Sequence, residues 1–258
     1  NTWPTQLRAQ CDLTMATGSG DMGKAAYSAG KPAYGVGAGT APIIVDETVD
    51  LADTAEKIRI GKTGDFASGC SAENSLVVQK GIYANLMEEL KKQGAYIATP
   101  EEKNRPQAVL WEDGHISRTY VAKPVGLIAE LAGITLPEGT QFIIVEEAGI
   151  GKGYPFTGEK LSLVLTVYSY NEFQEAIDKV NAITAYSGAG HSCGIHSNDK
   201  NRILELALNT KTSRVTVRQA HGASNSGNWH NGLAMTFSLG CGTWGGNIVS
   251  ENVTQKHY

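Results

Sequence analysis

The sequence predicts an α/β fold built on a largely parallel sheet. Short apolar runs rich in Val and Ile alternate with longer segments whose apolar residues recur at helical spacing, between residues 13 and 217. Interleaved strands and helices favour parallel pairing, because each helix returns the chain to the start of the next strand. With 258 residues, 41% of them hydrophobic, the chain can form a substantial core in one large domain or two moderate ones.

The first expected elements are a strand at residues 13–16 and a helix at residues 22–28, joined by the turn Thr17-Gly18-Ser19-Gly20. A Gly-rich turn between a strand and a helix presents backbone amides that can bind a phosphate, although ordinary turns of this composition are also common. Strands at 33–36 and 43–45 follow. A helix over residues 51–60 is expected next because Asp50 supplies its N-cap.

The alternation continues to residue 217. A strand at 75–78 leads into a helix at 82–93, where Leu86 and Leu90 share one face and Gly94 ends the helix. Further strands are expected at 141–145, 163–168, 194–196 and 214–217, and further helices at 124–132, 171–182 and 199–208. The Gly- and Asn-rich stretch 221–247 is too long for an ordinary loop, so we expect it to enclose a site.

Charge and cysteine usage argue against several classes of protein. The formal net charge of −4, with no basic run, argues against nucleic acid as a partner. Cys11, Cys70, Cys193 and Cys241 have no paired spacing, so neither a metal site nor a disulfide framework is predicted, and a reducing compartment is expected. No stretch approaches the roughly 20 apolar residues of a membrane span. We therefore expect a cytoplasmic protein without a membrane partner.

Cys70 lies in a small, polar segment that runs from Gly61 into the apolar strand at residues 75–78. A thiol among Gly and Ser residues at the start of a strand is open to a substrate and to backbone amides, as catalytic cysteines are. The alternative is an inert packing cysteine, because free Cys is among the most buried residue types. This segment alone leaves both interpretations open.

Six segments carry further motifs. They are residues 16–32, 35–42, the Cys70 segment, 159–162, 188–192 and 238–247. In this order they resemble the aldehyde dehydrogenase superfamily, specifically its CoA-acylating branch, over nearly the whole chain. The resemblance implies a three-layer fold with a parallel sheet and identifies Cys70 as the nucleophile. Members of the superfamily carry further strands of a Rossmann-like cofactor domain before the Thr17 turn, so the chain resembles the C-terminal part of a longer enzyme, with the N-terminal part of that domain missing.

The resemblance also implies a division of the chain. Residues 1–64 would be the end of the cofactor domain and residues 65–235 the nucleophile domain. Residues 236–258 would return to the cofactor domain and contribute to oligomerisation. Within them, 236–238 and 247–253 alternate in a way suited to pairing a strand across a subunit boundary, so a homo-oligomer is expected, although edge strands of one subunit would look the same.

The implied reaction passes through Cys70. Its thiolate adds to an aldehyde, a hydride leaves to NAD or NADP, and a thioester remains on the sulfur. Hydrolytic members use a glutamate to activate water, whereas this chain has Gly35 there and no carboxylate until Asp46, so coenzyme A is expected to take the acyl group. His191 resembles the histidine that acylating members place near the acyl-transfer site, and it would accept the CoA proton unless it only holds its loop. The other histidines are interpreted as surface or structural.

The cofactor residues follow from the same resemblance. Glu159 matches the glutamate that holds the nicotinamide ribose hydroxyls, a role that suits a carboxylate acceptor. Thr17, Gly18, Ser19 and Met22 are expected to form the other edge of the dinucleotide site, with amides and the Ser19 hydroxyl at the pyrophosphate. The choice between NAD and NADP stays open.

The substrate is less tightly defined. Arg214 and Arg218 are four residues apart in an expected strand and would point to one face, where a guanidinium can bind a carboxylate or sulfonate. The Arg218-Gln219 pair and residues 225–228 resemble acylating enzymes for succinate semialdehyde and sulfoacetaldehyde. Structural salt bridges are the commoner use of arginine in a strand, and acetaldehyde is the rival substrate. A hydrolytic dehydrogenase and a non-catalytic assembly module are the alternative functions, the first disfavoured by the missing glutamate.

Overall fold

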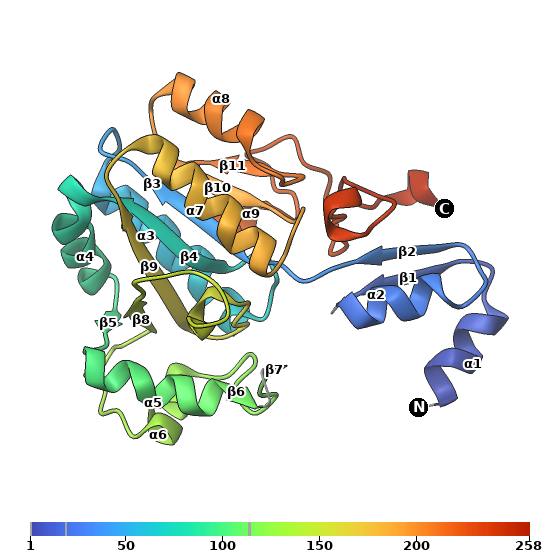
Figure 1. Cartoon of the computed structure of the whole chain (residues 1–258), viewed down its shortest axis with the longest axis horizontal. Coiled ribbons are helices and arrows are strands. Elements are labelled where there is room, and N and C mark those ends of the chain that lie inside the picture. The colour runs from blue at the N-terminus through green and yellow to red at the C-terminus, as the bar shows by residue number, and fades with distance from the viewer. Residues whose placement is uncertain (1, 19, 113–114) are drawn as a thin grey trace.

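Seven parallel strands form the central sheet of the structure, a computed structural model that describes residues 2–18, 20–112 and 115–258 (Figure 1). Their order across the sheet is β11-β10-β3-β4-β9-β8-β5. Along the chain they are β3 (Ala41–Val45), β4 (Glu73–Gln79), β5 (Ala95–Ile97), β8 (Phe142–Glu146), β9 (Val164–Tyr170), β10 (Cys193–His196) and β11 (Val215–Val217). Every neighbouring pair is parallel, which confirms the predicted α/β class.

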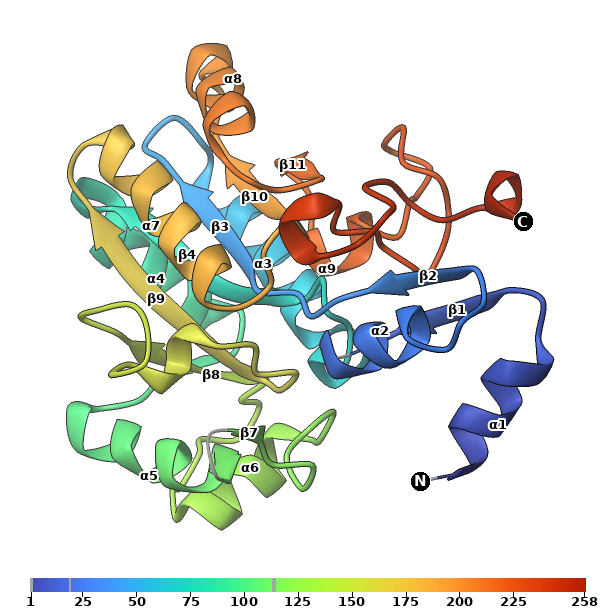
Figure 2. The same cartoon turned by 45° about the vertical axis from the view of Figure 1, so that its right-hand side comes forward.

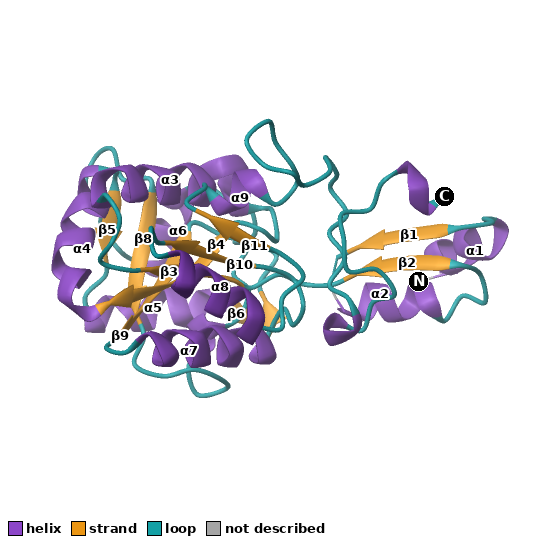
Figure 3. Ribbon diagram, turned by 90° about the horizontal axis from the view of Figure 1, so that it is seen from above, coloured by secondary structure: helices purple, strands orange, loops and turns teal. Residues whose placement is uncertain are grey.

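Helices cover both faces of this sheet and give the molecule three layers (Figure 3). One face packs on α3 (Leu51–Thr63) and α4 (Tyr83–Lys92), and the other on α7 (Phe173–Tyr186) and α8 (Lys200–Asn209). The strands are apolar on both sides, as buried parallel strands are. In β3, for example, Ile43 and Val45 face the first pair of helices and Ile44 faces the second.

Several elements were not predicted from the sequence. They are α1 (Thr2–Gln10), β5, α5 (Pro100–Leu110), the antiparallel pair β6 (Trp111–Glu112) and β7 (His115–Ile116), and the short α9 (His221–Ser224). The charged α5 lacks an apolar stripe and buries only Pro106 and Leu110, so helical periodicity did not show it. Its start is fixed by a capping box between Thr99 and Glu102. The helix expected at 124–132 is α6 (Val125–Ala132).

A smaller lobe holds the parallel strands β1 (Thr14–Thr17) and β2 (Ala33–Val36) with α2 (Gly20–Tyr27) packed on them. Residues 37–40 join β2 directly to β3 of the central sheet. The elements that follow this linker, β3 and α3, belong to the central sheet and to the helices that cover it.

The C-terminal segment returns to the small lobe, where Val249 and Val253 pack against Val36 of β2 (Figure 2). The stretches expected to alternate like strands, 236–238 and 247–253, form loops. Leu239, just after the first stretch, forms an isolated antiparallel bridge with Asn252 in the second, and the Val253 amide donates to the Ser238 carbonyl at 3.0 Å. Among the described residues, no helix has the length and apolar character needed to cross a membrane.

Candidate active site

Four of the predicted site residues lie at the amino edge of the central sheet. Cys70 precedes β4, Glu159 lies in the turn before β9, His191 precedes β10 and Arg214 precedes β11. Because all seven strands are parallel, their amino ends share one edge of the sheet. Residues 37–40 reach the same edge from the small lobe, where they enter β3.

The loop before Cys70 has an unusual backbone. Asp65, Phe66 and Ala67 have φ angles of 47°, 52° and 57°, in the left-handed region that costs a non-glycine residue about 1–2 kcal/mol. A hydrogen bond from the Ser68 amide to the Asp65 carbonyl, at 3.0 Å, closes the turn. The strained turn ends α3 and delivers the half-buried Cys70 thiol to the start of β4.

The Cys70 thiol and the His191 imidazole are in direct contact. His191 Nε2 lies 3.1 Å from Cys70 Sγ, and the other ring nitrogen, Nδ1, lies 2.7 Å from Ser192 Oγ. A nucleophile beside a base whose second nitrogen is held by a third group is the arrangement of a Cys–His nucleophilic site. The loop needs Gly190, with φ of 80°, because a Cβ there would lie 1.8 Å from the Cys241 carbonyl oxygen.

Both partners of this contact are neutral at rest. Burial raises the pKa of the Cys70 thiol to about 11, and the negative charge of Glu159 acts in the same direction. Burial lowers the pKa of His191 to about 3, with a further contribution from the positive charge of Arg214. At neutral pH the pair is therefore a thiol beside a neutral imidazole, not a thiolate beside an imidazolium.

A cavity of about 340 Å³ opens at Cys70. The end of α3 and the Cys70 loop form one side, and Gly222, Ala223, Ser226, Phe237 and Leu239 line the other. These last residues all come from the Gly- and Asn-rich stretch, so that stretch supplies one wall of the cavity. The volume is suited to a small aldehyde.

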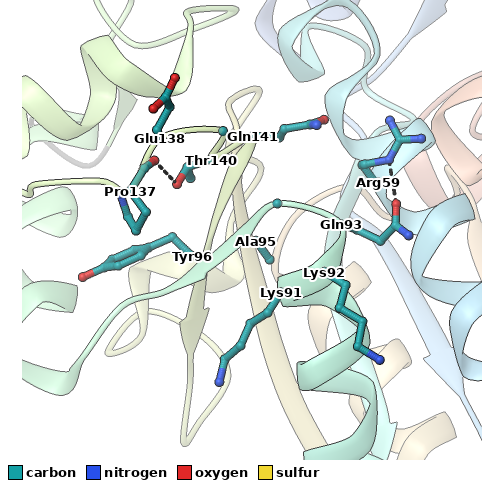
Figure 4. Close-up of a pocket in the computed structure, with 12 residues that line it drawn as sticks. Arg59, Lys91, Lys92, Gln93, Ala95, Tyr96, Pro137, Glu138, Thr140 and Gln141 are labelled. Carbon is teal, nitrogen blue, oxygen red and sulfur yellow. Dashed lines mark hydrogen bonds between the residues drawn. The ribbon is translucent and has the colours of Figure 1, made fainter.

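A larger cavity, of about 570 Å³, lies elsewhere at this edge, between the end of α4 and the turn before β8 (Figure 4). Arg59 Nε donates to Gln93 Oε1 there at 3.0 Å. The lysines that line it, Lys91 and Lys92, are paired with glutamates three residues earlier on the exposed surface of α4. The described residues that line it include no cysteine or histidine, so we do not assign it to the reaction.

Glu159 is half-buried, and its Oε1 accepts a hydrogen bond of 2.9 Å from the Gly39 amide in the segment that joins the two lobes. Burial raises the pKa of this carboxyl to about 7, while the Gly39 hydrogen bond opposes the shift. The same Gly39 also packs against Cys70, because a Cβ at Gly39 would collide with the Cys70 carbonyl oxygen. The predicted cofactor carboxylate and the predicted nucleophile therefore lie near each other.

Gly35 lies inside β2 with no room for a side chain. The Tyr27 hydroxyl donates to the Gly35 carbonyl at 3.0 Å and accepts from its amide at 2.9 Å. A Cβ at position 35 would lie 2.9 Å from the Tyr27 ring. A glutamate at this position would therefore displace Tyr27.

The turn between β1 and α2 lies next to the end of β2, because Thr17 of β1 pairs with Val36 of β2. The Gly18 amide donates to the Val36 carbonyl at 3.3 Å, and a Cβ at Gly18 would lie 3.0 Å from the Met22 sulfur. Thr17 Oγ1 lies 3.0 Å from Ser238 Oγ, and the Met22 side chain is 47% exposed. Ser19 lies outside the described residues.

The two predicted arginines lie at opposite ends of β11, and therefore at opposite edges of the sheet. Arg218 follows the last residue of β11, has a left-handed φ of 51° and binds Asn198 at the carboxyl edge. Four strand residues separate the two positions by about 13 Å. Arg214 stays at the Cys70 edge, 4% exposed, with both Nη atoms donating to the Gly240 carbonyl at 2.9 and 2.6 Å. Its buried Nε has no partner among the described residues.

Two residues at the site were missed by the sequence analysis. His221, interpreted as surface or structural, is fully buried, and its Nδ1 lies 2.7 Å from the Ser71 carbonyl oxygen next to Cys70. Asn74 binds the backbone on both sides of Glu159. No motif distinguishes either residue, since their roles depend on segments distant in the sequence.

Comparison with known proteins shows which proteins this chain is similar to. The model of the aldehyde dehydrogenase family matches residues 8–107. An acylating sulfoacetaldehyde dehydrogenase of Cupriavidus necator is 42% identical over 255 residues, which are 98% of this chain and 52% of that protein. An acetylating succinate-semialdehyde dehydrogenase of Clostridium kluyveri is 36% identical over 253 residues, 98% of this chain and 56% of that protein.

A solved structure agrees with these relatives. The crystal structure of an acetylating aldehyde dehydrogenase from Geobacillus thermoglucosidasius superimposes with a TM-score of 0.95 at 35% identity, over 98% of this chain and 56% of that one. The chain thus spans about half the length of the curated relatives it matches. Over nearly its whole length the chain is similar to acylating aldehyde dehydrogenases, and its residues 8–107 match the model of the aldehyde dehydrogenase family.

Proposed function

We propose that this chain carries the nucleophile of a CoA-acylating, NAD(P)-dependent aldehyde dehydrogenase. The observation that carries the proposal is the 3.1 Å contact between Cys70 Sγ and His191 Nε2 at a cavity large enough for a small aldehyde. The acylating relatives support the same reaction class. A non-catalytic module would have no need for a neutral Cys–His pair held by Ser192 beside such a cavity.

The first step is addition of the Cys70 sulfur to the aldehyde carbon. Because the thiol pKa is raised and the imidazole pKa is lowered, the proton passes from Sγ to His191 Nε2 only as the carbon–sulfur bond forms. The Cys70 amide has no acceptor among the described residues, so it is free to donate to the hemithioacetal oxyanion. The positive charge of Arg214 lowers the thiol pKa and thus favours the same step.

Collapse of the oxyanion expels a hydride and leaves a thioester on Cys70, and a bound nicotinamide dinucleotide supplies the hydride acceptor. The residues present fit such a group. Glu159 Oε1 is engaged by Gly39, so its other oxygen is available to ribose hydroxyls. The turn at Thr17 and Gly18 opens beside the linker to the central sheet, with Met22 exposed on the first turns of α2.

The acyl group then passes to the thiol of coenzyme A. Tyr27 fills the space beside Gly35, so no carboxylate there can activate water against the thioester. His191 first releases to solvent the proton that it took from Cys70. It then accepts the proton of the CoA thiol as the new carbon–sulfur bond forms, and passes it to the departing Cys70 sulfur 3.1 Å away. The thiol and the neutral imidazole are restored.

The substrate we propose is a short aldehyde with an anionic group. Two relatives are named for sulfoacetaldehyde and succinate semialdehyde, both of which carry such a group. Arg214 is the arginine at the Cys70 edge, and we propose its guanidinium as the group that binds the carboxylate or sulfonate. The acetylating neighbour favours acetaldehyde as the second candidate, which would use the same chemistry without the arginine.

Product analysis tests the reaction class. The full-length enzyme is incubated with aldehyde and NAD(P), with and without coenzyme A, and products and enzyme peptides are analysed by mass spectrometry. We expect acyl-CoA only when CoA is present, and an acyl group on the Cys70 peptide when it is absent. Steady formation of the free carboxylic acid without CoA would instead show a hydrolytic enzyme, and absence of any acylated peptide would favour the assembly module.

A further inference from the structure

Asn74, four residues after Cys70, holds the turn that carries Glu159. Its Nδ2 donates to the Gly158 carbonyl at 3.0 Å, and its Oδ1 accepts from the Lys160 amide at 3.1 Å. One side-chain amide thus binds the backbone immediately before and immediately after Glu159. Asn74 is only 4% exposed, so little water competes for these hydrogen bonds.

The other hydrogen bonds of this turn are local. Lys160 Nζ donates to the Phe156 carbonyl at 2.7 Å and to the Gly158 carbonyl at 3.3 Å, and Thr166 Oγ1 donates to the Phe156 carbonyl at 2.9 Å. They fold the turn and tie it to β9. The pairing of β4 with β9 begins only at Ser75 and Thr166, six residues beyond Lys160. Within the described residues, Asn74 is therefore the side chain of β4 that fixes this turn.

We infer that Asn74 is a positioning residue that sets the location of the Glu159 carboxylate relative to the Cys70 thiol. The inference rests on the proposed function, in which Cys70 carries the acyl group and Glu159 holds the nicotinamide ribose. Hydride transfer requires both reactants in a fixed relation, and a misplacement of about 1 Å can cost about 100-fold in rate. Asn74 provides that relation, because it lies in β4, which starts three residues after Cys70, and binds the backbone of both neighbours of Glu159.

Two substitutions test the contribution of each Asn74 hydrogen bond. Asn74→Asp keeps an acceptor for the Lys160 amide but replaces the donor with an oxygen that faces the Gly158 carbonyl, whereas Asn74→Ala removes both bonds. In each variant we expect a raised KM for the dinucleotide and a hydride-transfer step slowed about 10- to 100-fold in single-turnover measurements.

A second activity shows whether the change is confined to the cofactor side. Exchange of labelled CoA into acyl-CoA needs Cys70 and His191 but no nicotinamide. Since neither residue contacts the Asn74 side chain, we expect this exchange, and the rate of Cys70 alkylation by iodoacetamide, to stay within about twofold of the wild type. Equal losses of hydride transfer and CoA exchange, or an unchanged KM for the dinucleotide, would overturn the inference.

Asn181 provides a matched control, because it forms the same pair of bonds elsewhere. Its Nδ2 donates to the Asn209 carbonyl at 2.8 Å and its Oδ1 accepts from the Lys211 amide at 3.4 Å, on either side of Thr210. We expect Asn181→Ala to leave the ratio of hydride transfer to CoA exchange unchanged. A similar drop in that ratio would show that loss of any such asparagine disturbs the reaction, which also contradicts the inference.

Hydrogen exchange keeps the inference separate from the proposed function. The Lys160 amide should exchange slowly in the wild type and in Asn74→Asp, which retains its acceptor, and faster in Asn74→Ala. If the wild-type enzyme forms no acyl-CoA, the proposed function fails while this measurement still decides whether Asn74 holds the turn. Unchanged exchange at Lys160 in Asn74→Ala would refute the positioning role whatever the enzyme catalyses.

Discussion

The two edges of the central sheet satisfy their buried polar groups in different ways. At the carboxyl edge, Asp46 is fully buried but accepts hydrogen bonds from Thr48, Ser197 and Arg202, and Arg202 also pairs with Glu47 at 2.9 Å. At the amino edge, Cys70, His191, Glu159 and Arg214 form no ion pair within the described part of the chain, and burial shifts the pKa of each away from its charged form.

This difference identifies the working edge of the sheet. Buried groups that are not paired cost folding free energy, and perturbed titration without pairing is typical of reaction sites. Open parallel sheets usually bind ligands at their carboxyl ends. The groups that we propose to react lie at the amino ends instead, at the edge where the small lobe joins the sheet through residues 37–40.

Removal of the nucleophile should have the largest effect. We expect Cys70→Ala to reduce acyl-CoA formation by at least about 10³-fold while the fold and dinucleotide binding stay intact, because only the thiol can form the covalent intermediate. Cys11→Ser, at the end of α1, is the control and should keep normal turnover. Residual activity above a few per cent in Cys70→Ala would remove the basis for treating the amino edge as the reactive one.

Loss of the base should have the next largest effect. In His191→Asn, acyl transfer to CoA should slow by about 10²-fold or more, and by more than hydride transfer does, because the CoA proton loses its acceptor. Rapid-mixing experiments should then show a burst of reduced cofactor followed by a slow steady state. If neither phase slows, the contact at 3.1 Å holds the loop and does not transfer protons. Equal slowing of both phases would mean that deprotonation of Cys70 limits the reaction more than deprotonation of CoA.

The two arginines compare the edges directly. With an anionic aldehyde, Arg214→Met should lower kcat/KM about 10- to 100-fold, the equivalent of about 1.5–3 kcal/mol for a charge-assisted hydrogen bond. Arg218→Met, at the other end of the same strand, should change it by less than about twofold. Kinetics with sulfoacetaldehyde, succinate semialdehyde and butyraldehyde test this, and Arg214→Lys controls for lost packing. Parallel losses on all three aldehydes would favour acetaldehyde-type specificity.

The sequence analysis selected residues that lie in recognisable motifs, and it missed residues whose roles depend on tertiary contacts. Cys70 and His191 were recognised in separate segments, and the parallel sheet explains their meeting, since each precedes a strand. Arg218 was misplaced because strand alternation was extended beyond Val217, where the backbone turns left-handed. Asn74 was missed because its partners lie 84 and 86 residues away. Local patterns therefore pointed to the residues of the proposed reaction, whereas the groups proposed to position them depended on tertiary structure.

The smallest expected effect is on the pH dependence of stability. It tests whether the two edges of the sheet differ in the pairing or in the burial of their titratable groups. His196 lies at the carboxyl edge, 1% exposed, and burial lowers its pKa to about 4. In the unfolded chain the pKa of His196 is near 6.5, so between pH 6.5 and 4 the unfolded chain binds more protons at this residue than the folded chain does. Stability is complete above about pH 6.5 and falls as the pH drops, by at most about 1.4 kcal/mol per pH unit for this residue.

Replacement of His196 by glutamine should remove that slope. Urea unfolding of the wild type and His196→Gln at pH 7, 6 and 5 should show the stability difference shifting in favour of the variant as the pH falls. His191, with its pKa lowered to about 3, should contribute a similar slope from the amino edge. Equal dependence of stability on pH from His196 and His191 would mean that burial acts alike at both edges of the sheet. The two edges would then differ only in the ion pairing of their buried groups. If the difference in unfolding free energy between the wild type and His196→Gln does not change with pH, His196 is not held neutral by burial. Neighbouring groups at the carboxyl edge would then stabilise its charged form.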